Sequence, residues 1–300
     1  MNLSLTETPL DKTVYLSPEN LLSSFQTMGK SLAVTTRSFH FKGMSEVRDL
    51  DWNLMDQLHR PCVHRTYEEA LRLATGRSFA VSLTRVGPLK LFTLVIDIQL
   101  GPGLFYQGMT LFNLIYLHSV IRSLPEGGGV KVEFYIVSHR LFKFLHGFLH
   151  RRLLRLNEIQ NAEDEPIRDQ RTFLRSKGYR FETDEPNYLN SNTLTDKVIP
   201  PQLDRTYQIS LKGISADGLK KVSAGPVDLL VRKNSDQNFT VWTAVCPHEG
   251  GPLESGKICN GTIVCPWHGL SQSGVEVSPG RSQNLGGLQI AFDGNQLIVS

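Results

Sequence analysis

The chain has 300 residues, of which 40% are hydrophobic and 20% are charged, the proportions of an ordinary globular protein. Its length suggests two domains, and its net charge of +3 is too small to indicate binding to nucleic acid. Two of its four cysteines lie in the Cys/His arms described below, so no disulfide framework remains.

The sequence also predicts no targeting segment and no membrane span. Residues 1–7 contain neither the basic nor the apolar part of a signal peptide. The most apolar stretch, residues 89–117, is interrupted by Asp97, by Gly101-Pro102-Gly103 and by Gln107, so it does not predict a spanning helix. We therefore expect a cytoplasmic protein in a reducing compartment.

The first half of the chain predicts an antiparallel sheet followed by a long helix. Residues 1–50 show no strong periodicity. Strands are indicated by runs rich in Val, Leu, Ile, Phe and Thr, at 78–86, 89–100, 104–124 and 130–138. Apolar residues then recur at helical spacing from Leu141 to Asn157, and the helix is expected to continue to about Ser176.

Two groups of histidines accompany these elements. In the run from Asn53 to His64, a helix would place Asp56 and His59 on one face, and Pro61 would bend the path to His64. Two imidazoles with one more distant carboxylate can form a facial triad, which leaves open positions on Fe(II). Cys62, inside this run, is expected to be a packed side chain.

His146 and His150 are four residues apart on the predicted helix, a spacing that also occurs in metal sites. Because no Glu directly follows His146, we expect these two histidines to serve packing and a basic helix face.

The last third of the chain predicts an all-β region. Residues 185–205 have the composition of a linker, and short strands separated by turn sequences follow. We therefore expect domains at 1–184 and 206–300. The fold class is α+β, with a curved sheet and a long C-terminal helix in the first domain.

Two short arms in the second domain carry the strongest chemical signal. They read Cys246-Pro247-His248 and Cys265-Pro266-Trp267-His268. Two thiolates and two imidazoles are the ligands of a Rieske [2Fe–2S] centre. A Cys₂His₂ zinc site is the alternative, but zinc fingers place both Cys on one arm and both His on the other. Cys259, between the arms, is expected to be a small packed residue.

Residues 206–300 resemble a Rieske domain of the oxygenase or ferredoxin type. The resemblance implies a low-potential [2Fe–2S] cluster held by Cys246, His248, Cys265 and His268. In the cytochrome bc type, each arm carries an extra Cys that forms a disulfide. The matching positions here are Gly251 and Trp267, so that bridge is absent.

The run from Asn53 to His64 resembles the mononuclear-iron motif of Rieske non-haem iron oxygenases, Asp-x-x-His-x-x-x-x-His, and is especially close to the vanillate O-demethylase group. The resemblance implies that His59 and His64 bind iron. It also implies that Asp56 connects His59 to a cluster imidazole by hydrogen bonds. The first domain would then have the helix-grip (START-like) fold of this family.

The third iron ligand of that family lies in an acidic run on a late helix. Residues 163–170 match this run, with a spacing one residue short. Asp164 is the candidate ligand that the resemblance implies. Glu163, Glu165 and Asp169 remain as neighbouring alternatives.

The order of the two parts is permuted relative to the family, in which the Rieske domain comes first. A linker of roughly twenty residues spans on the order of 60 Å when extended, at about 3.3 Å per residue, so the cluster could still reach the iron domain. Family members transfer electrons between neighbouring subunits of a homotrimer. Here the linkage leaves transfer within one chain and transfer between chains both open.

The resemblance implies an oxygenase with a [2Fe–2S] cluster and a mononuclear Fe(II). It would use dioxygen and electrons from an external reductase or ferredoxin to hydroxylate or demethylate an apolar or aromatic small molecule. Pocket walls are expected from the strands, where alternation does not decide which face points inward; the candidates are Phe92, Leu94, Ile96, Phe105, Phe112, Ile115 and Phe134.

The alternative is a Rieske electron-transfer protein whose first domain binds a ligand but is catalytically inactive. If His59, His64 and an acidic oxygen converge on one point, the oxygenase is favoured. If these side chains diverge, the electron-transfer protein is favoured.

Overall fold

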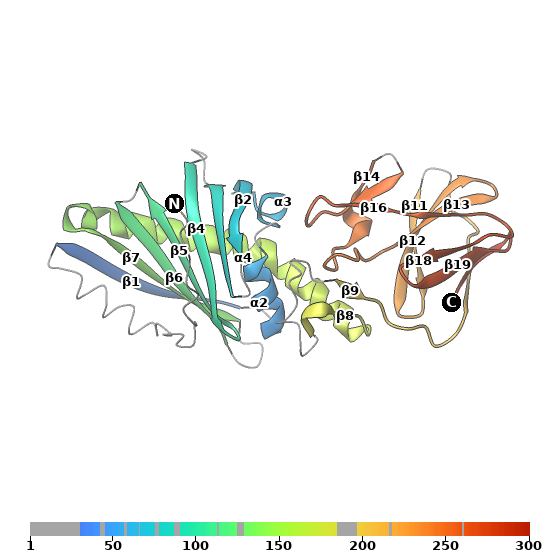
Figure 1. The fold of residues 1–300 in the computed structure, drawn as a ribbon, viewed down its shortest axis with the longest axis horizontal. Helices are drawn as coiled ribbons and strands as arrows, with labels where there is room; N and C mark the ends of the chain where they lie inside the picture. The colour runs from blue at the N-terminus through green and yellow to red at the C-terminus, as the bar shows by residue number, and fades with distance from the viewer. Residues whose placement is uncertain are drawn as a thin grey trace, which may run out of the picture.

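A seven-stranded antiparallel sheet, in the order β1-β7-β6-β5-β4-β3-β2, dominates the first half of the computed structural model (Figure 1). Its strands are β1 (Leu32–Phe41), β2 (Tyr67–Thr75), β3 (Phe79–Val86), β4 (Leu91–Gly101), β5 (Leu104–Leu111), β6 (Ile115–Ser123) and β7 (Val130–His139). The structure describes residues 31–42, 46–56, 59–65, 67–75, 78–86, 91–112, 114–124, 129–184, 197–215, 218–259 and 261–300.

Residues 1–50, which include β1, show no strong periodicity in the sequence. This strand pairs with β7 in a register that places Thr35 opposite Ile136 and Arg37 opposite Phe134. Directly opposed residues of an antiparallel pair lie on the same face. Two positions of β1 on the helix-facing side are therefore polar, and the apolar alternation that marks a half-buried strand is lost.

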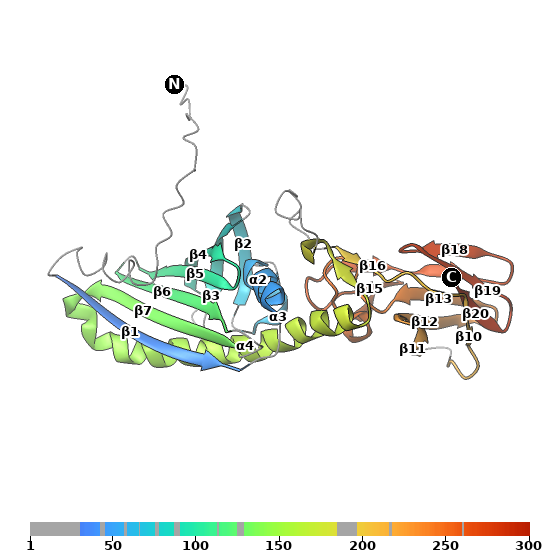
Figure 2. The same ribbon diagram turned by 90° about the horizontal axis from the view of Figure 1, so that it is seen from below.

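A 31-residue helix, α4 (His146–Ser176), lies along the concave face of the sheet and projects beyond it (Figure 2). Its Leu149 and Leu153 pack against a core that includes Phe134 and Ile136. The helix ends at Ser176 as expected. Residues 140–145, which were expected to be its first turns, form a 3₁₀ helix instead.

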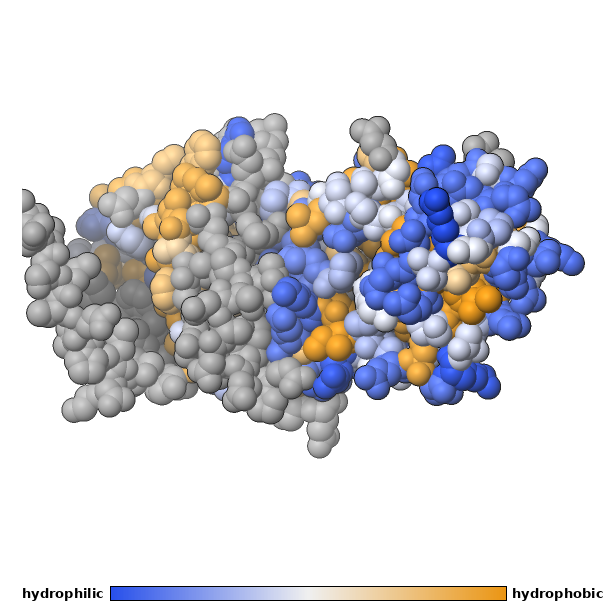
Figure 3. All heavy atoms as spheres, turned by 45° about the vertical axis from the view of Figure 1, so that its right-hand side comes forward, coloured by the Kyte–Doolittle hydropathy of each residue, from blue (hydrophilic) through white to orange (hydrophobic). Residues whose placement is uncertain are grey.

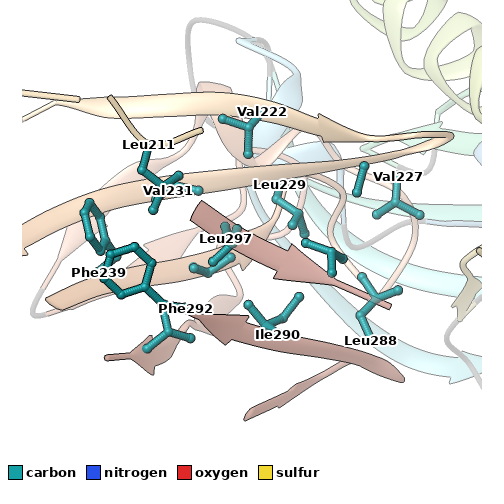
Figure 4. Close-up of a cluster of buried hydrophobic side chains, with 14 of the residues drawn as sticks. Leu211, Val222, Val227, Leu229, Val231, Phe239, Leu288, Ile290, Phe292 and Leu297 are labelled. Carbon is teal, nitrogen blue, oxygen red and sulfur yellow. The ribbon is translucent and has the colours of Figure 1, made fainter. Parts of the chain in front are cut away.

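The C-terminal half, from β10 to β20, is all-β, with one four-stranded sheet in the order β10-β20-β19-β18 and another in the order β11-β12-β13-β17. The strands are β10 (Tyr207–Ser210), β11 (Leu219–Ala224), β12 (Val227–Ser235), β13 (Asn238–Thr243), β17 (Val275–Val277), β18 (Ser282–Leu285), β19 (Leu288–Phe292) and β20 (Gln296–Val299). Their shared core includes Leu229, Val231, Ile290 and Leu297 (Figure 4). The predicted α+β fold class is confirmed.

A smaller three-stranded sheet of β14 (Lys257–Cys259), β15 (Thr262–Val264) and β16 (Ser271–Ser273) carries the second Cys/His arm between its last two strands. Cys259 was expected to be packed. It is exposed because β14 is an edge strand whose three residues all face solvent.

The two halves are joined at the C-terminal end of α4. There β8 (Arg180–Phe181) pairs with β9 (Val198–Ile199), which lies inside the predicted linker. The backbone N–H of Val198 donates to the carbonyl of Pro247 in the first Cys/His arm, at 3.0 Å. The chain that leads into the C-terminal half is thus held against that arm.

No helix in the described part of the chain has the length and apolar character needed to cross a bilayer.

His146 and His150 are buried between α4 and β1. The Thr35 hydroxyl lies 2.9 Å from a ring nitrogen of each, and the Ser138 hydroxyl lies 2.8 Å from the other nitrogen of His146. The expected packing role agrees with these contacts. Burial, together with the positive charge of Arg37, lowers the pKa of His150 to about 4.

Acidification should therefore destabilise the fold. An unfolded histidine takes up a proton near pH 6.5, whereas folded His150 stays neutral until about pH 4. The stability that neutral His150 contributes is complete above pH 6.5 and is lost as the pH falls towards 4. In urea titrations, His150→Gln should lower the loss of unfolding free energy between pH 7 and pH 5 by roughly 1–2 kcal/mol. An equal loss in the variant, with His40→Gln as the exposed control, would contradict this assignment.

Candidate metal centres and the contact between them

Three side chains from distant parts of the N-terminal half converge at one point. His59 Nε2 and His64 Nε2 each lie 3.3 Å from Asp164 Oδ1, and the candidate ligand atoms all lie within 4.8 Å of one another. Both imidazoles are buried, and the Asp164 side chain is 13% exposed. We call these residues the His-His-Asp set.

The local backbone explains the convergence and corrects one expectation. Asp56 and His59 do not share a helix, because α2 (Val47–Met55) ends at Asp56 and a second helix, α3 (Arg60–Val63), starts after His59. Pro61 lies in the first turn of α3, where its missing N–H costs no helical hydrogen bond. One short helix therefore separates His59 from His64 and lets both rings reach Asp164.

Each ring is oriented by a carboxylate on its other nitrogen. His59 Nδ1 lies 3.2 Å from Asp56 Oδ2, and His64 Nδ1 lies 3.1 Å from Glu163 Oε2. Such contacts hold the Nε2 atoms of metal-binding histidines toward the ion. Glu163 was an alternative ligand, but in the structure it contacts His64 from outside the set. Glu165 and Asp169 do not converge with the set.

The His-His-Asp set has the features of a metal site. Among the described residues, no hydrogen-bond partner reaches the buried His59 Nε2 or Asp164 Oδ1. Buried polar atoms without partners are rare in folded proteins. Two imidazole nitrogens and a carboxylate oxygen suit a first-row divalent ion, including Fe(II) with open positions. Burial lowers the pKa of His59, but the carboxylates of Asp164 and Asp56 outweigh it and raise that pKa to about 9.

The four residues of the two arms also lie together. Cys246 and Cys265 are buried, and the rings of His248 and His268 are 4.8 Å apart at 83°. The backbone N–H groups of His248 and Glu249 donate to the Cys246 sulfur, and those of Trp267 and His268 donate to the Cys265 sulfur. A Cβ at Gly251 would lie 2.6 Å from Cys265 Sγ, so the space beside the sulfur requires glycine. These residues fit a [2Fe–2S] cluster.

One carboxylate oxygen connects the two groups. Asp56 Oδ2 lies 2.7 Å from His268 Nε2 and 3.2 Å from His59 Nδ1. Contact through Nε2 leaves the Nδ1 of His268 for a metal. Burial raises the pKa of Asp56, but the hydrogen bonds from His268 and His59 outweigh burial and hold it well below its usual value.

A buried ion pair stabilises the contact between the halves and was not foreseen. Arg171 on α4 is fully buried, and its Nε donates to Asp49 Oδ1 at 3.0 Å. Its guanidinium lies 4.0 Å from the ring centroid of Trp52, and Nη1 donates to the carbonyl of Glu249 at 3.3 Å. Trp52 in turn packs on Trp267 of the second arm, with centroids 5.8 Å apart.

Glu249 is a second acidic neighbour of the arms that the sequence analysis missed. Its carboxylate is buried, with Oε2 3.2 Å from His268 Nε2 and Oε1 3.7 Å from His248 Nε2. The signal in the sequence was an acid directly after His248.

Cys62, expected to be packed, is exposed, because α3 turns it away from the two buried histidines beside it.

Two cavities adjoin the His-His-Asp set. One of about 70 Å³ is lined by the set itself, and one of about 170 Å³ lies between α4 and the inward face of β4 to β7. Of the predicted wall residues, Phe134 lines the larger cavity, and Phe105 and Ile115 are buried in the adjacent core. Phe92, Leu94 and Phe112 are exposed, and Ile96 is half-buried. Hydrophobic side chains, coloured orange, gather on the surface of the N-terminal half in the space-filling view (Figure 3). On β4 it is Thr93, Val95 and Asp97 that point inward, because side chains alternate.

Comparisons with known proteins support one part of this description. Residues 207–277 match the family model of the Rieske [2Fe-2S] domain. The C-terminal half therefore contains a Rieske domain, which binds a [2Fe–2S] cluster. No curated protein matches the chain.

Solved structures resemble the chain over about half its length. Truncated norcoclaurine synthase from Thalictrum flavum is 12% identical over 46% of this chain and 96% of that chain, with a TM-score of 0.36. The Zhui aromatase/cyclase from Streptomyces sp. R1128 is 10% identical over 47% and 96%, with a TM-score of 0.35. The di-domain ARO/CYC StfQ of the steffimycin pathway is 10% identical over 51% and 55%, with a TM-score of 0.38. Likeness at these scores does not bear on ligands or activity.

A methyl group at position 251 should prevent cluster assembly. The Cβ of Gly251→Ala would meet Cys265 Sγ at 2.6 Å and the Trp267 ring at 3.2 Å. We expect loss of the visible absorption and of the reduced-state electron paramagnetic resonance signal of the cluster, with an unchanged far-ultraviolet circular dichroism spectrum. Gly147→Ala, whose Cβ would meet nothing closer than 4.0 Å, is the control. A variant that retains a full cluster would show that this space is not needed.

Proposed function

We propose that the protein is a Rieske-type oxygenase. It would hydroxylate or demethylate an apolar or aromatic small molecule, using dioxygen and electrons from an external reductase or ferredoxin. The observation that carries the proposal is the position of Asp56, whose single Oδ2 atom contacts both His59 and His268. An electron carrier with an inactive first domain would not require a link between an imidazole of the cluster and a second metal site.

The arrangement of donors supports two different metal groups. The set of two thiolates and two imidazoles suits a [2Fe–2S] cluster, and the His-His-Asp set suits Fe(II). When bound, the first would supply single electrons and the second would supply a coordination site for dioxygen. The two sets lie on opposite sides of one buried carboxylate, that of Asp56.

The residues of the chain have distinct tasks in this proposal. Asp56 and Glu163 hold the His59 and His64 rings so that both Nε2 atoms face Asp164. Asp56 also fixes the His268 ring through its Nε2. The apolar cavity beside the set would bind the substrate and exclude water.

Iron content separates the oxygenase from the electron carrier. Protein purified without oxygen should contain about three irons per chain, two from the cluster and one from the His-His-Asp set. His59→Ala should lower the content to about two and leave the cluster spectrum unchanged, because His59 belongs to the set and not to the arms. His40→Ala, an exposed histidine, is the control. About two irons per chain in the unaltered protein would favour the carrier.

Asp56→Asn tests the connection itself. The amide retains the shape of the side chain but lacks the charge, and it cannot accept from both imidazoles at full strength. We expect both metals to remain. Reoxidation of the reduced cluster by dioxygen, followed by stopped-flow absorbance, should slow by roughly 10–100-fold. Asp236→Asn, on an exposed turn, is the matched control. Unchanged reoxidation would remove Asp56 from the proposed route.

A further inference from the structure

The two cavities meet at three carboxamide side chains. Gln107 on β5 and Asn157 and Gln160 on α4 line both the cavity of the His-His-Asp set and the larger cavity beside it. A molecule in the larger cavity would therefore meet these amides at the end nearest the set.

Two of these lining amides use their nitrogen to donate to the protein, which leaves the oxygen as the acceptor for a ligand. Gln107 uses its Nε2 to donate to Asp97 Oδ1 at 2.7 Å, and Asn157 uses its Nδ2 to donate to the carbonyl of Leu153 at 3.0 Å. These contacts require the nitrogen on the protein side and so fix the orientation of both amides. Among the described residues, no donor reaches either amide oxygen, although each could accept two hydrogen bonds.

Most of the remaining wall is apolar, with Thr93, His118, Ser119 and Arg152 as its polar members, and the space is small. Leu117, Phe134 and Leu153 are buried side chains of this wall, and Met109, Leu111 and Leu149 continue it. A cavity of about 150 Å³ with such a lining binds benzene. The larger cavity, at about 170 Å³, is thus matched to a molecule with one ring or an aliphatic body of that size.

Among the described residues, the larger cavity offers no buried cation to an anionic ligand. Among the described residues that line the larger cavity, Arg152 is the one with a full charge; it is exposed, and its guanidinium lies over the Phe148 ring at 5.4 Å. Burial lowers the pKa of His118 to about 4, so this ring is neutral at pH 7. In the smaller cavity, Arg60 already pairs with Asp97 at 2.9 Å.

We propose that the larger cavity binds a neutral, single-ring-sized apolar molecule that carries a hydroxyl or N–H group, which donates to the amide oxygen of Gln107 or of Asn157. That this molecule is the substrate rests on the proposed oxygenase function. The binding of this molecule to the cavity does not depend on the oxygenase function, because neither amide is a candidate metal ligand. A site built to accept from a donor rejects an analogue that lacks it, since the acceptors are then buried without partners.

Equilibrium binding to the full chain tests the proposal with three probes of similar shape. 4-Methylphenol carries a donor, 4-fluorotoluene replaces the hydroxyl with fluorine, and 4-methylbenzoate carries a negative charge. By calorimetry at pH 7, we expect 4-methylphenol to bind at least about tenfold more tightly than 4-fluorotoluene, and 4-methylbenzoate to bind more weakly than both. A difference below about threefold, tighter binding of the benzoate, or no measurable binding of 4-methylphenol would overturn the proposal.

Two variants locate the effect. The preference for 4-methylphenol should fall below about threefold in at least one of the variants Asn157→Leu and Gln107→Met, while 4-fluorotoluene still binds, which also shows that the cavity is intact. Glu158→Leu, an exposed neighbour on α4, should keep the full preference. Persistence of the preference in both amide variants would refute the assignment. A preference that appears in protein with only two irons per chain would leave this inference standing and remove the oxygenase.

Discussion

A buried carboxylate shared by two imidazoles organises this molecule. An ionised acid is costly to bury unless charged or hydrogen-bonding partners surround it, and Asp56 has His59 on one side and His268 on the other. The helix that ends at Asp56 presents Asp49, Trp52 and Asn53 on the same buried face, at helical spacing. Asp49 pairs with Arg171, and Trp52 packs against Trp267. One face of α2 therefore holds α4, the Rieske arms and the His-His-Asp set together.

The two acids beside the Rieske arms also have an electrostatic effect. Asp56 and Glu249 are both buried within hydrogen-bonding distance of His268 Nε2. A negative charge near a cluster opposes the addition of an electron, and the effect is large where water is excluded. This agrees with the low potential that the resemblance to oxygenase-type Rieske domains implies.

The long helix and the Cys/His arms could be predicted from the sequence because each depends on residues that are close together in the chain. The long helix was predicted with an end at about Ser176, because apolar residues recur at helical spacing from Leu141 to Asn157, although its first residues form a 3₁₀ helix. The Cys/His arms could be predicted because ligand chemistry restricts spacing. The strand β1 could not, since Thr35 and Arg37 occupy its inward side for reasons that lie on β7 and α4.

Other features of the site depended on long-range contacts. Alternation along β4 was visible, but its direction was not, so Phe92 and Leu94 were as plausible a wall as Thr93 and Asp97. The grouping of His59, His64 and Asp164 was accessible only through resemblance. The role of Gln107 was not accessible at all, because an amide in a strand acquires meaning from the cavity that it faces.

The hairpin of β8 and β9 places one further constraint on the molecule. It follows α4, leads into the C-terminal half, and is hydrogen-bonded to the first Rieske arm through Val198 and Pro247. Both rings that flank Asp56 consequently belong to a single polypeptide, and the tether keeps them at a high effective concentration. Dilution that would separate subunits therefore does not break the contact between the two halves. Each copy of the chain contains Asp56 together with both of its imidazole partners.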